Sequence, residues 1–529
     1  MKTVLMVAAE NDALPGAKVG GIGDVVRDLP KAVANEGCKV HVVIPAYGFL
    51  HALANTQHIA HFPVFFAGQV EHVDLYSIPL SSAKPGVYSD DQVQVCQWVL
   101  EHRGFSPMGV GKVYCNDPDD RPFASDASKY ALFCAAVGQA ILNRAFGDLD
   151  ILHLHDWHAA MLAILRQYDP RYAMLKSVET VYSIHNLALQ GVRPFRGDSS
   201  SLMAWFPALE YDSASICDPQ IKHCVNPMRA AIVLADKIHA VSPTYSREIQ
   251  RASHIEKFVY GGEGLEYDLV AAEHEGRLFG ILNGCEYPEG ETYKKLAKAD
   301  LIKVFESQLL NWIASGEQLP SAHWIADKRI SAWSARKKRG LVISSVGRLT
   351  EQKVRLLKLV VRYADKRQSV LAHLLDCLGD DGVLVFLGSG ASDYEAFLRQ
   401  ISAEYSSLIF LNGYAESVSQ ALYSSGDLFL MPSSFEPCGI SQMLAMRAGQ
   451  PCLVHGVGGL NDTVKDGVNG FVFTGASGEE QALNFINKFT ECLELMQHSA
   501  KQYKLVADAA AAERFTWQSV ASEYLEKLY

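Results

Sequence analysis

The stretch that most limits how this chain can fold runs from Asp427 to Val464 and reads DLFLMPSSFEPCGISQMLAMRAGQPCLVHGVGGLNDTV. A fully apolar run at 428–431 ends in a turn, and apolar residues with helical spacing resume after Ile440. The pattern predicts a buried strand, a polar loop and a helix, which is the repeating unit of a doubly wound parallel sheet. The loop FEPCG at 435–439 therefore lies at the carboxyl end of a strand and the amino end of a helix, where such sheets bind ligands.

Glu436 is the acid of that loop. A carboxylate in this place can bind sugar hydroxyls or offset positive charge at a reacting carbon. The alternative is a carboxylate that the helix dipole favours without any catalytic role. A glycine-rich turn at Gly456, Gly458 and Gly459 follows the next apolar run, and we expect it to let backbone approach a bound group closely.

Strand, loop and helix patterns recur in two series. The first opens with an apolar strand at 3–8, the turn KVGGIG at 18–23, a predicted helix at 24–36 and the strand KVHVVIP at 39–45. The second begins at Gly340. Because 529 residues are too many for one core, we predict an α/β protein with two Rossmann-like domains closing on a cleft. Their predicted ranges are 1–280, completed by a helix at 511–529, and 281–510.

Cations follow the first strand of each series. Lys18 beside Gly20 and Gly21 suggests a loop that brings one charge and bare amides to a phosphate, although a purely structural turn is as consistent with the residues. Arg348 and Lys353 follow the strand at 340–347, and a diphosphate fits such a pair; solvated surface charge is the alternative. The turn KVGGIG at 18–23 lacks the GxGxxG fingerprint of dinucleotide-binding proteins, which argues against a nicotinamide cofactor.

Histidines mark the ends of two further predicted strands. HLHDWH at 153–158 combines three histidines with Asp156, and the strand that starts at Thr180 ends at His185 and Asn186. Alternating histidines can share a metal ion. A sugar-binding cleft uses the same residue types, and no matching second ligand cluster follows, so we expect no metal.

Composition excludes several classes of function. A net charge of −11 without basic clusters argues against a nucleic-acid partner. No apolar run is long enough to span a membrane, and the start MKTVLMVAAE reads better as a strand than as a signal peptide. Eleven cysteines without CxxC spacing predict reduced thiols and a cytoplasmic protein.

Taken together, these motifs resemble bacterial glycogen synthases and plant starch synthases. KVGGIGDV, HLHDWH, SIHNLALQG, ADKIHAVSPTY, GILNG, GRLTEQK, FEPCG and GGLNDTV occur in the order and approximate spacing of that family. Its members are retaining glucosyltransferases of family 5 with the GT-B fold. The resemblance implies transfer of glucose from ADP-glucose to the non-reducing 4-hydroxyl of an α-1,4-glucan, without a cofactor or metal, in the bacterial cytosol or a plastid.

The resemblance also implies roles for individual residues. The implied catalytic residues are Glu436, Lys353, Arg348, His185 and Asp156. The residues implied to bind the nucleotide sugar are Lys18, Gly20, Gly21, Asn283, Gly388, Tyr414, Cys438, Gly439 and Ser441, and those on the acceptor side are Asn186 and Gln190. Lys353 and Arg348 would neutralise the diphosphate, and Tyr414 would stack near the adenine.

The chain departs from the family pattern at Val354, Arg355, Cys285, Glu286 and Ser434, and the segment between its first strand and Lys18 is longer than usual. Arg355 is expected to add a cation near the diphosphate loop. These departures leave open a divergent GT-B glycosyltransferase that uses UDP-glucose or a small acceptor. A glucan-binding protein without turnover is a further alternative, which the charged residues named above disfavour, and the HDWH and HNLALQG segments disfavour an epimerase.

Overall fold

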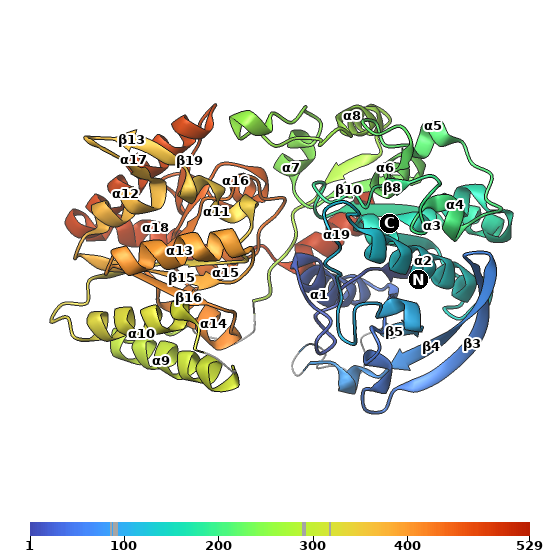
Figure 1. Cartoon of the computed structure of the whole chain (residues 1–529), viewed down its shortest axis with the longest axis horizontal. Helices are drawn as coiled ribbons and strands as arrows, with labels where there is room; N and C mark the ends of the chain where they lie inside the picture. The colour runs from blue at the N-terminus through green and yellow to red at the C-terminus, as the bar shows by residue number, and fades with distance from the viewer. Residues whose placement is uncertain (85–86, 88–93, 288–292, 317–318) are drawn as a thin grey trace. The chain divides into compact units, whose positions relative to one another are not determined.

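The computed structural model describes residues 1–84, 87, 94–287, 293–316 and 319–529, and these form two compact units (Figure 1). The first unit comprises Met1–Ser253, Gly261–Glu286 and Thr516–Tyr529, and the second comprises His254–Tyr260 and Tyr287–Phe515. The sequence prediction placed the division after residue 280 and the return of the chain at 511. It did not foresee that the loop 254–260 packs with the second unit.

The first unit is built on a nine-stranded sheet in the order β11-β10-β7-β6-β1-β2-β5-β4-β3. Its strands are β1 (Thr3–Val7), β2 (Lys39–Pro45), β3 (Gln57–Phe66), β4 (Gln69–Ile78), β5 (Val95–Glu101), β6 (Ile151–His155), β7 (Glu179–Ile184), β10 (Lys237–Ala240) and β11 (Leu278–Gly280). All neighbours pair in parallel except at the β5-β4-β3 edge, which is antiparallel. The antiparallel strands β3 and β4 extend the parallel part of the sheet at this edge.

Helices pack against this sheet and close its core. They are α1 (Gly21–Asn35), α2 (Ala124–Leu142), α3 (Asp156–Tyr168), α4 (Leu202–Trp205), α5 (Ser213–Ile216), α6 (Pro227–Leu234), α7 (Pro243–Glu248), α8 (Glu266–His274) and α19 (Trp517–Lys527), with a short hairpin of β8 (Arg193–Pro194) and β9 (Cys224–Val225). Trp517 and Tyr524 of α19 are buried in the same core as Val25 and Leu29 of α1. Helix α1 begins at Gly21, three residues before the predicted start, so Gly21 and Gly23 lie in its first turn.

The second unit contains a six-stranded parallel sheet in the order β16-β15-β12-β17-β18-β19. Its strands are β12 (Leu341–Val346), β15 (Gly382–Gly388), β16 (Leu408–Asn412), β17 (Leu428–Met431), β18 (Cys452–His455) and β19 (Phe471–Phe473), with an unpredicted antiparallel hairpin of β13 (Val360–Tyr363) and β14 (Lys366–Ser369). Its helices are α9 (Lys298–Ser315), α10 (Ser321–Ser334), α11 (Glu351–Lys358), α12 (Val370–Leu378), α13 (Ser392–Glu404), α14 (Glu416–Ser425), α15 (Ser441–Arg447), α16 (Gly458–Thr463), α17 (Gly478–His498) and α18 (Ala500–Ala512).

Both sheets reverse their strand order beside their first strand. In the first unit the chain proceeds from β1 toward β2 and later resumes on the other side of β1 with β6. In the second unit β12 has β15 on one side and β17 on the other. Open parallel sheets bind ligands outside the carboxyl ends of the strands at such a reversal, because the two flanking loops diverge there. Among the described residues, none of the helices combines the length and apolar character needed to cross a membrane.

Candidate active site

The loop at 433–439 connects β17 to α15, as the sequence predicted. Glu436 is 7% exposed, and its Oε2 accepts a hydrogen bond from Ser433 Oγ at 2.9 Å and another from Lys353 Nζ. Lys353 lies on α11, which follows β12. The fold therefore joins two residues predicted to be catalytic, one from each side of the strand reversal.

Backbone contacts fix this loop against α11. Gln352 Nε2 donates to the carbonyl oxygen of Phe435 at 2.8 Å, and the amide of Ser434 donates to the carbonyl oxygen of Gln352 at 2.8 Å. These bonds bind the residues next to Glu436 to the residue before Lys353. The relative position of the carboxylate and the ammonium group is therefore set by main chain as well as by their own ion pair.

The glycine turn at 456–459 packs closely against the 433–439 loop. A Cβ atom at Gly458 would collide with the carbonyl oxygen of Glu436, and one at Gly459 with that of Cys438. The amide of Gly459 donates to the Glu436 carbonyl at 3.0 Å. These glycines therefore allow α16 to approach the loop that carries Glu436.

The remaining predicted residues of the second unit lie at strand ends on the same edge of the sheet. Arg348 follows β12 and is exposed, and no carboxylate pairs with it in the part of the chain that the structure describes. Gly388 ends β15, and Tyr414, which is 65% exposed, follows β16. In the FEPCG loop Cys438 is buried and Gly439 has a φ of 75°, and Ser441 opens α15 and accepts a hydrogen bond from Tyr423 at 3.1 Å.

Arg355, which was expected to add a cation near the diphosphate loop, lies on α11 and is bonded to side chains of the second unit. Its guanidinium donates to Tyr260 Oη at 2.7 Å and to Glu351 Oε1 at 2.9 Å. The preceding Val354 is fully buried in the core, where an apolar side chain packs without strain. The departures at these two positions are therefore packing features of α11.

In the first unit, Asp156 holds the turn that carries His185. It opens α3 with a φ of 55°, and its Oδ1 accepts hydrogen bonds from the amide of His185 at 2.7 Å and of Asn186 at 3.4 Å. Burial raises the pKa of Asp156 to about 7, although the two amides act in the opposite direction. The structure thus brings together the predicted pair Asp156 and His185, with the carboxylate bound to backbone.

A second histidine supports His185. The Nδ1 of His155 and the Nε2 of His185 are 2.9 Å apart, and the ring of His155 stacks on that of His153 at 4.2 Å. Burial lowers the pKa of all three imidazoles well below the ordinary value, so each is neutral at pH 7. One ring must donate to the other, and this fixes the orientation of His185 at the end of β7.

His153 of HLHDWH is fully engaged by neighbouring side chains. His153 contacts Tyr529 Oη at 2.6 Å and Ser183 Oγ at 2.7 Å, so both of its ring nitrogens already have partners. Among the described residues, no three histidine, cysteine or acidic side chains are arranged to bind one ion. The alternating histidines instead belong to a buried hydrogen-bond network beneath the carboxyl ends of β6 and β7.

The loop around Lys18 is neutralised by carboxylates of its own unit. Lys18 Nζ lies 2.5 Å from Asp24 and 3.4 Å from Asp12, and the amides of Val19 and Gly20 both donate to Glu10. Asp12 also pairs with Arg27 at 2.6 Å and with Lys84. The Gly20 amide, which was expected to face a phosphate, is therefore occupied.

The predicted acceptor-side residues make local bonds. Asn186 Oδ1 accepts from the amide of Ala188 at 3.1 Å, and Gln190 Nε2 donates to the carbonyl oxygens of Leu187 at 3.1 Å and Glu263 at 3.2 Å. Asn283, which was predicted to bind the nucleotide sugar, is buried, and its Oδ1 has no partner in the part of the chain that the structure describes. A buried amide oxygen without a partner is a position at which a ligand donor can bind.

The chain matches the family described as the starch synthase catalytic domain over residues 3–271. It also matches the family described as glycosyl transferases group 1 over residues 327–504. The first match spans more than half of the chain. The chain belongs to the glycogen and starch synthase family.

Curated glycogen synthases are similar to this chain over nearly its full length. The enzyme from Desulfitobacterium hafniense is 27% identical over 98% of both chains, and that from Streptococcus equi subsp. equi is 29% identical over 99% of this chain and 98% of its own. Among solved structures, the catalytic domain of Starch Synthase IV from Arabidopsis thaliana, bound to ADP and acarbose, has a TM-score of 0.72 at 24% identity and covers 99% of this chain and 98% of its own. The fold is thus GT-B with two Rossmann-like domains, and the protein is a glycosyltransferase.

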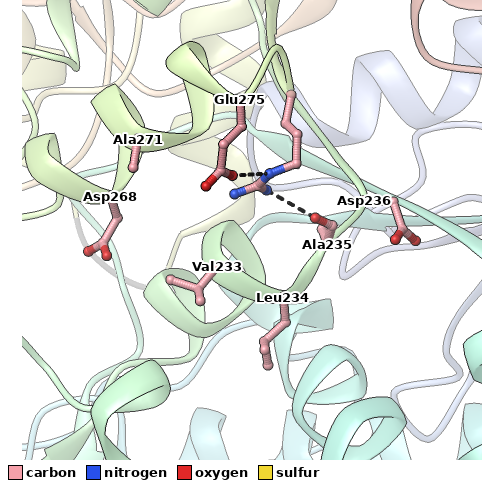
Figure 2. A pocket seen from close by; sticks show the side chains of 8 residues that line it. Val233, Leu234, Ala235, Asp236, Asp268, Ala271 and Glu275 are labelled. Atoms are coloured by element: carbon pink, nitrogen blue, oxygen red, sulfur yellow. Dashed lines mark hydrogen bonds and ion pairs between the residues drawn. The ribbon is translucent and has the colours of Figure 1, made fainter.

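A pocket with a cavity volume of about 470 Å³ lies away from these strand ends (Figure 2). It is lined by Val233, Leu234, Ala235, Asp236, Asp268, Ala271, Glu275 and Arg277. Arg277 bonds Glu275 at 2.7 Å and the carbonyl of Ala235 at 3.0 Å. Asp236 and Arg277 immediately precede β10 and β11, so the pocket lies at the amino ends of these strands, whereas Asp156 and His185 follow the carboxyl ends of β6 and β7.

Sequence reasoning missed four residues that bond to the candidate site residues of the two units or to their neighbours. Ser433, Gln352 and His155 bond directly to the groups named above, and Glu10 occupies the amides beside Lys18. Gln352 and His155 lie inside the motifs GRLTEQK and HLHDWH, so each could have been proposed as a neighbour of a predicted catalytic residue. Glu10 could have been found as an acid following a buried first strand.

Proposed function

We propose that this protein transfers glucose from ADP-glucose to the non-reducing 4-hydroxyl of an α-1,4-glucan, with retention of configuration. The observation that carries the proposal is the pairing of Lys353 with buried Glu436 at the strand reversal of the second unit, in a chain that belongs to the synthase family. Curated relatives that align over nearly all of this chain bear the name glycogen synthase, which supports the acceptor class.

Departure of the diphosphate is the step that needs positive charge. Cleavage of the anomeric C–O bond leaves the bonding electron pair on the diphosphate oxygen. Exposed Arg348 can bind two phosphate oxygens with its planar fork, and Lys353 adds a point charge. Because two fixed cations stabilise the leaving group, the proposed reaction requires neither a metal ion nor an organic cofactor.

The anomeric carbon gains positive character as the leaving group departs. Glu436 offers a carboxylate whose Oε2 is held by Ser433 and Lys353, and the His185 carbonyl offers a second negative dipole. Asp156 fixes the backbone amide of His185, so this turn is ordered before the donor binds. The acceptor hydroxyl attacks the face that the diphosphate leaves, and the departing phosphate takes its proton, which balances the transfer.

The choice of ADP-glucose rests on similarity and on one exposed ring. Starch Synthase IV from Arabidopsis thaliana, which shares the fold, was solved with ADP and acarbose. Tyr414 follows β16 and exposes most of its side chain, which suits stacking against a base. Stacking accepts any base, so the donor nucleotide requires a direct measurement.

The deciding experiment is nucleotide release from ADP-glucose and UDP-glucose, with and without glycogen or malto-oligosaccharides, in buffer containing EDTA. We expect ADP release that depends on the glucan, lengthened chains, and no loss of rate on chelation. A preference for UDP-glucose or for a small acceptor would support the divergent-transferase alternative. Binding of glucan without release of either nucleotide would overturn the proposal in favour of a silent binding protein.

A further inference from the structure

The loop 254–260 belongs to the second unit, whereas the residues before and after it belong to the first. The amide of His254 donates to the Val259 carbonyl at 2.8 Å, and the amide of Val259 donates back at 3.1 Å. At its base, the hydroxyl of Ser253 accepts a hydrogen bond from the amide of Gly261 at 2.9 Å. These bonds give the loop a defined shape that presents Phe258 and Tyr260.

Arg355 is the residue of α11 that holds this loop. Besides Tyr260 Oη and Glu351, its guanidinium donates to the carbonyl oxygen of Ile255 at 3.3 Å. Its central carbon lies 3.9 Å from the centre of the Phe258 ring, which is the distance of a stacked cation–π contact. The side chain is 23% exposed, so these interactions are partly shielded from water.

Tyr260 connects the same loop to the catalytic residues. Its ring centre lies 4.8 Å from that of Phe435, which precedes Glu436. Phe435 is in turn bonded through its carbonyl to Gln352, which precedes Lys353. Arg355 and Tyr260 therefore contact the two segments that carry Lys353 and Glu436, one residue or two away from each.

We propose that Arg355 and Tyr260 are positioning residues, which use the 254–260 loop to hold α11 and the 433–439 loop in the register that pairs Lys353 with Glu436. The inference rests on the proposed glucosyl transfer for its kinetic consequences and on the printed geometry for its structural ones. It assigns to Arg355 a role opposite to the one that its charge suggests. The residue supports the leaving-group cation without contacting the diphosphate.

A positioning role and a diphosphate-binding role for Arg355 predict different effects of the Tyr260→Phe substitution. If Arg355 positions Lys353 and Glu436, loss of the tyrosine hydroxyl loosens the loop and lowers kcat by about three- to tenfold, the effect of one typical hydrogen bond. If Arg355 were a diphosphate ligand, removal of the hydroxyl would free its guanidinium and lower the KM for the donor. Tyr267→Phe, which alters a tyrosine that is 83% exposed on α8, is the matched control and should change neither constant.

Arg355→Ala should lower kcat by about ten- to a hundredfold, because small misplacement of reacting groups is costly, with a smaller change in KM. Arg355→Lys should recover an intermediate kcat, since lysine can still donate to Tyr260 but cannot form the full set of contacts. Lys358→Ala removes a cation of the same helix that pairs with Asp393 at 3.2 Å, and it should leave both constants unchanged. A rise in donor KM at constant kcat for Arg355→Ala would overturn the proposal.

Amide hydrogen exchange separates failure of this inference from failure of the proposed function, because it needs no turnover. In Arg355→Ala, amides at 434–437 should exchange faster than in the wild type, whereas Lys358→Ala should match the wild type. Unchanged exchange at 434–437 in a folded Arg355→Ala protein would overturn the positioning role whatever the donor. Faster exchange in a protein that turns over no donor would support the positioning role and reject glucosyl transfer.

Discussion

Each unit has a lysine after its first strand, and sequence alone treats the two lysines alike. Lys18 follows β1 in the first unit, and Lys353 follows β12 in the second. Lys18 lies between Asp12 and Asp24, and the adjacent amides are bonded to Glu10. Lys353 pairs with Glu436, while the nearby Arg348 is exposed. A cation beside glycines is therefore not an anion site by itself, because the companions of the cation decide how much charge reaches a ligand.

The largest expected effect is that of Glu436→Ala, which tests the catalytic side of this comparison. We expect kcat to fall by about a thousandfold, because the carboxylate at the donor sugar is lost while the fold persists. Steady-state kinetics with the preferred donor measure the effect, and circular dichroism checks folding. Glu416→Ala, which alters an exposed acid at the start of α14, is the control. Near-normal turnover in a folded Glu436→Ala protein would reject the assignment of this loop.

Lys353→Ala should follow, with kcat lower by about 10²-fold, because the departing diphosphate loses a fixed charge. Arg348→Ala should cost less, since an exposed cation is screened by water and salt. Both effects are measured as nucleotide release at saturating donor. An equal or larger loss for Arg348→Ala would reverse the order of importance that burial suggests.

Lys18→Ala should have a smaller effect than Lys353→Ala, a rise in donor KM of about tenfold or less, because Asp12 and Asp24 already offset its charge. Asp12→Asn should act in the opposite direction and lower the donor KM, since it leaves Lys18 with one fewer carboxylate. The KM of each variant for the nucleotide sugar is the measurement. If Lys18→Ala abolishes turnover as Lys353→Ala does, the contrast between the two turns is wrong.

The smallest expected effects are on stability. Asp156 and Asp12 should differ in how their contributions to the free energy of unfolding depend on pH. Burial raises the pKa of Asp156 from 3.8 to about 7, so the folded state binds its proton more tightly than the unfolded state does. Its contribution to the free energy of unfolding therefore falls as pH rises from about 4 to about 7. Burial also acts to raise the pKa of Asp12, but the hydrogen bond from Lys84 and the charges of Lys18 and Arg27 lower it overall. The contribution of Asp12 is accordingly present above pH 3.8 and lost at lower pH.

Denaturant unfolding of Asp156→Asn and Asp12→Asn at pH 4, 5.5 and 7 tests this contrast. The stability of Asp156→Asn relative to wild type should improve as pH rises, because the asparagine keeps an acceptor for the His185 amide without a charge to bury. The loss of stability in Asp12→Asn should instead be nearly the same at all three pH values, because the contribution of Asp12 is lost only below pH 3.8. A stability difference for Asp156→Asn that does not change with pH would contradict the raised pKa of Asp156.

The sequence identified much of this site because its motifs coincide with strand ends. FEPCG and GRLTEQK follow apolar runs typical of buried strands, so the sequence predicts that Glu436, Arg348 and Lys353 follow the carboxyl ends of strands. HLHDWH and SIHN likewise place Asp156 and His185 at the ends of two strands, and the structure shows that these strands are neighbours. These predictions succeed because apolar periodicity and turn residues act over short stretches of chain.

What the sequence could not supply are the partners that arrive from distant stretches. The bond between Arg355 and Tyr260 joins residues 95 apart in the chain, and the approach of Gly458 to the Glu436 carbonyl depends on the packing of α16. The sequence pattern also did not reveal that Asp12 pairs with Lys18. The sequence by itself determined the two α/β series, the order of their loops and the identity of the charged residues at their ends. The tertiary structure decided which of those charges are neutralised, because ion pairs and hydrogen bonds depend on distances that only the packed fold defines.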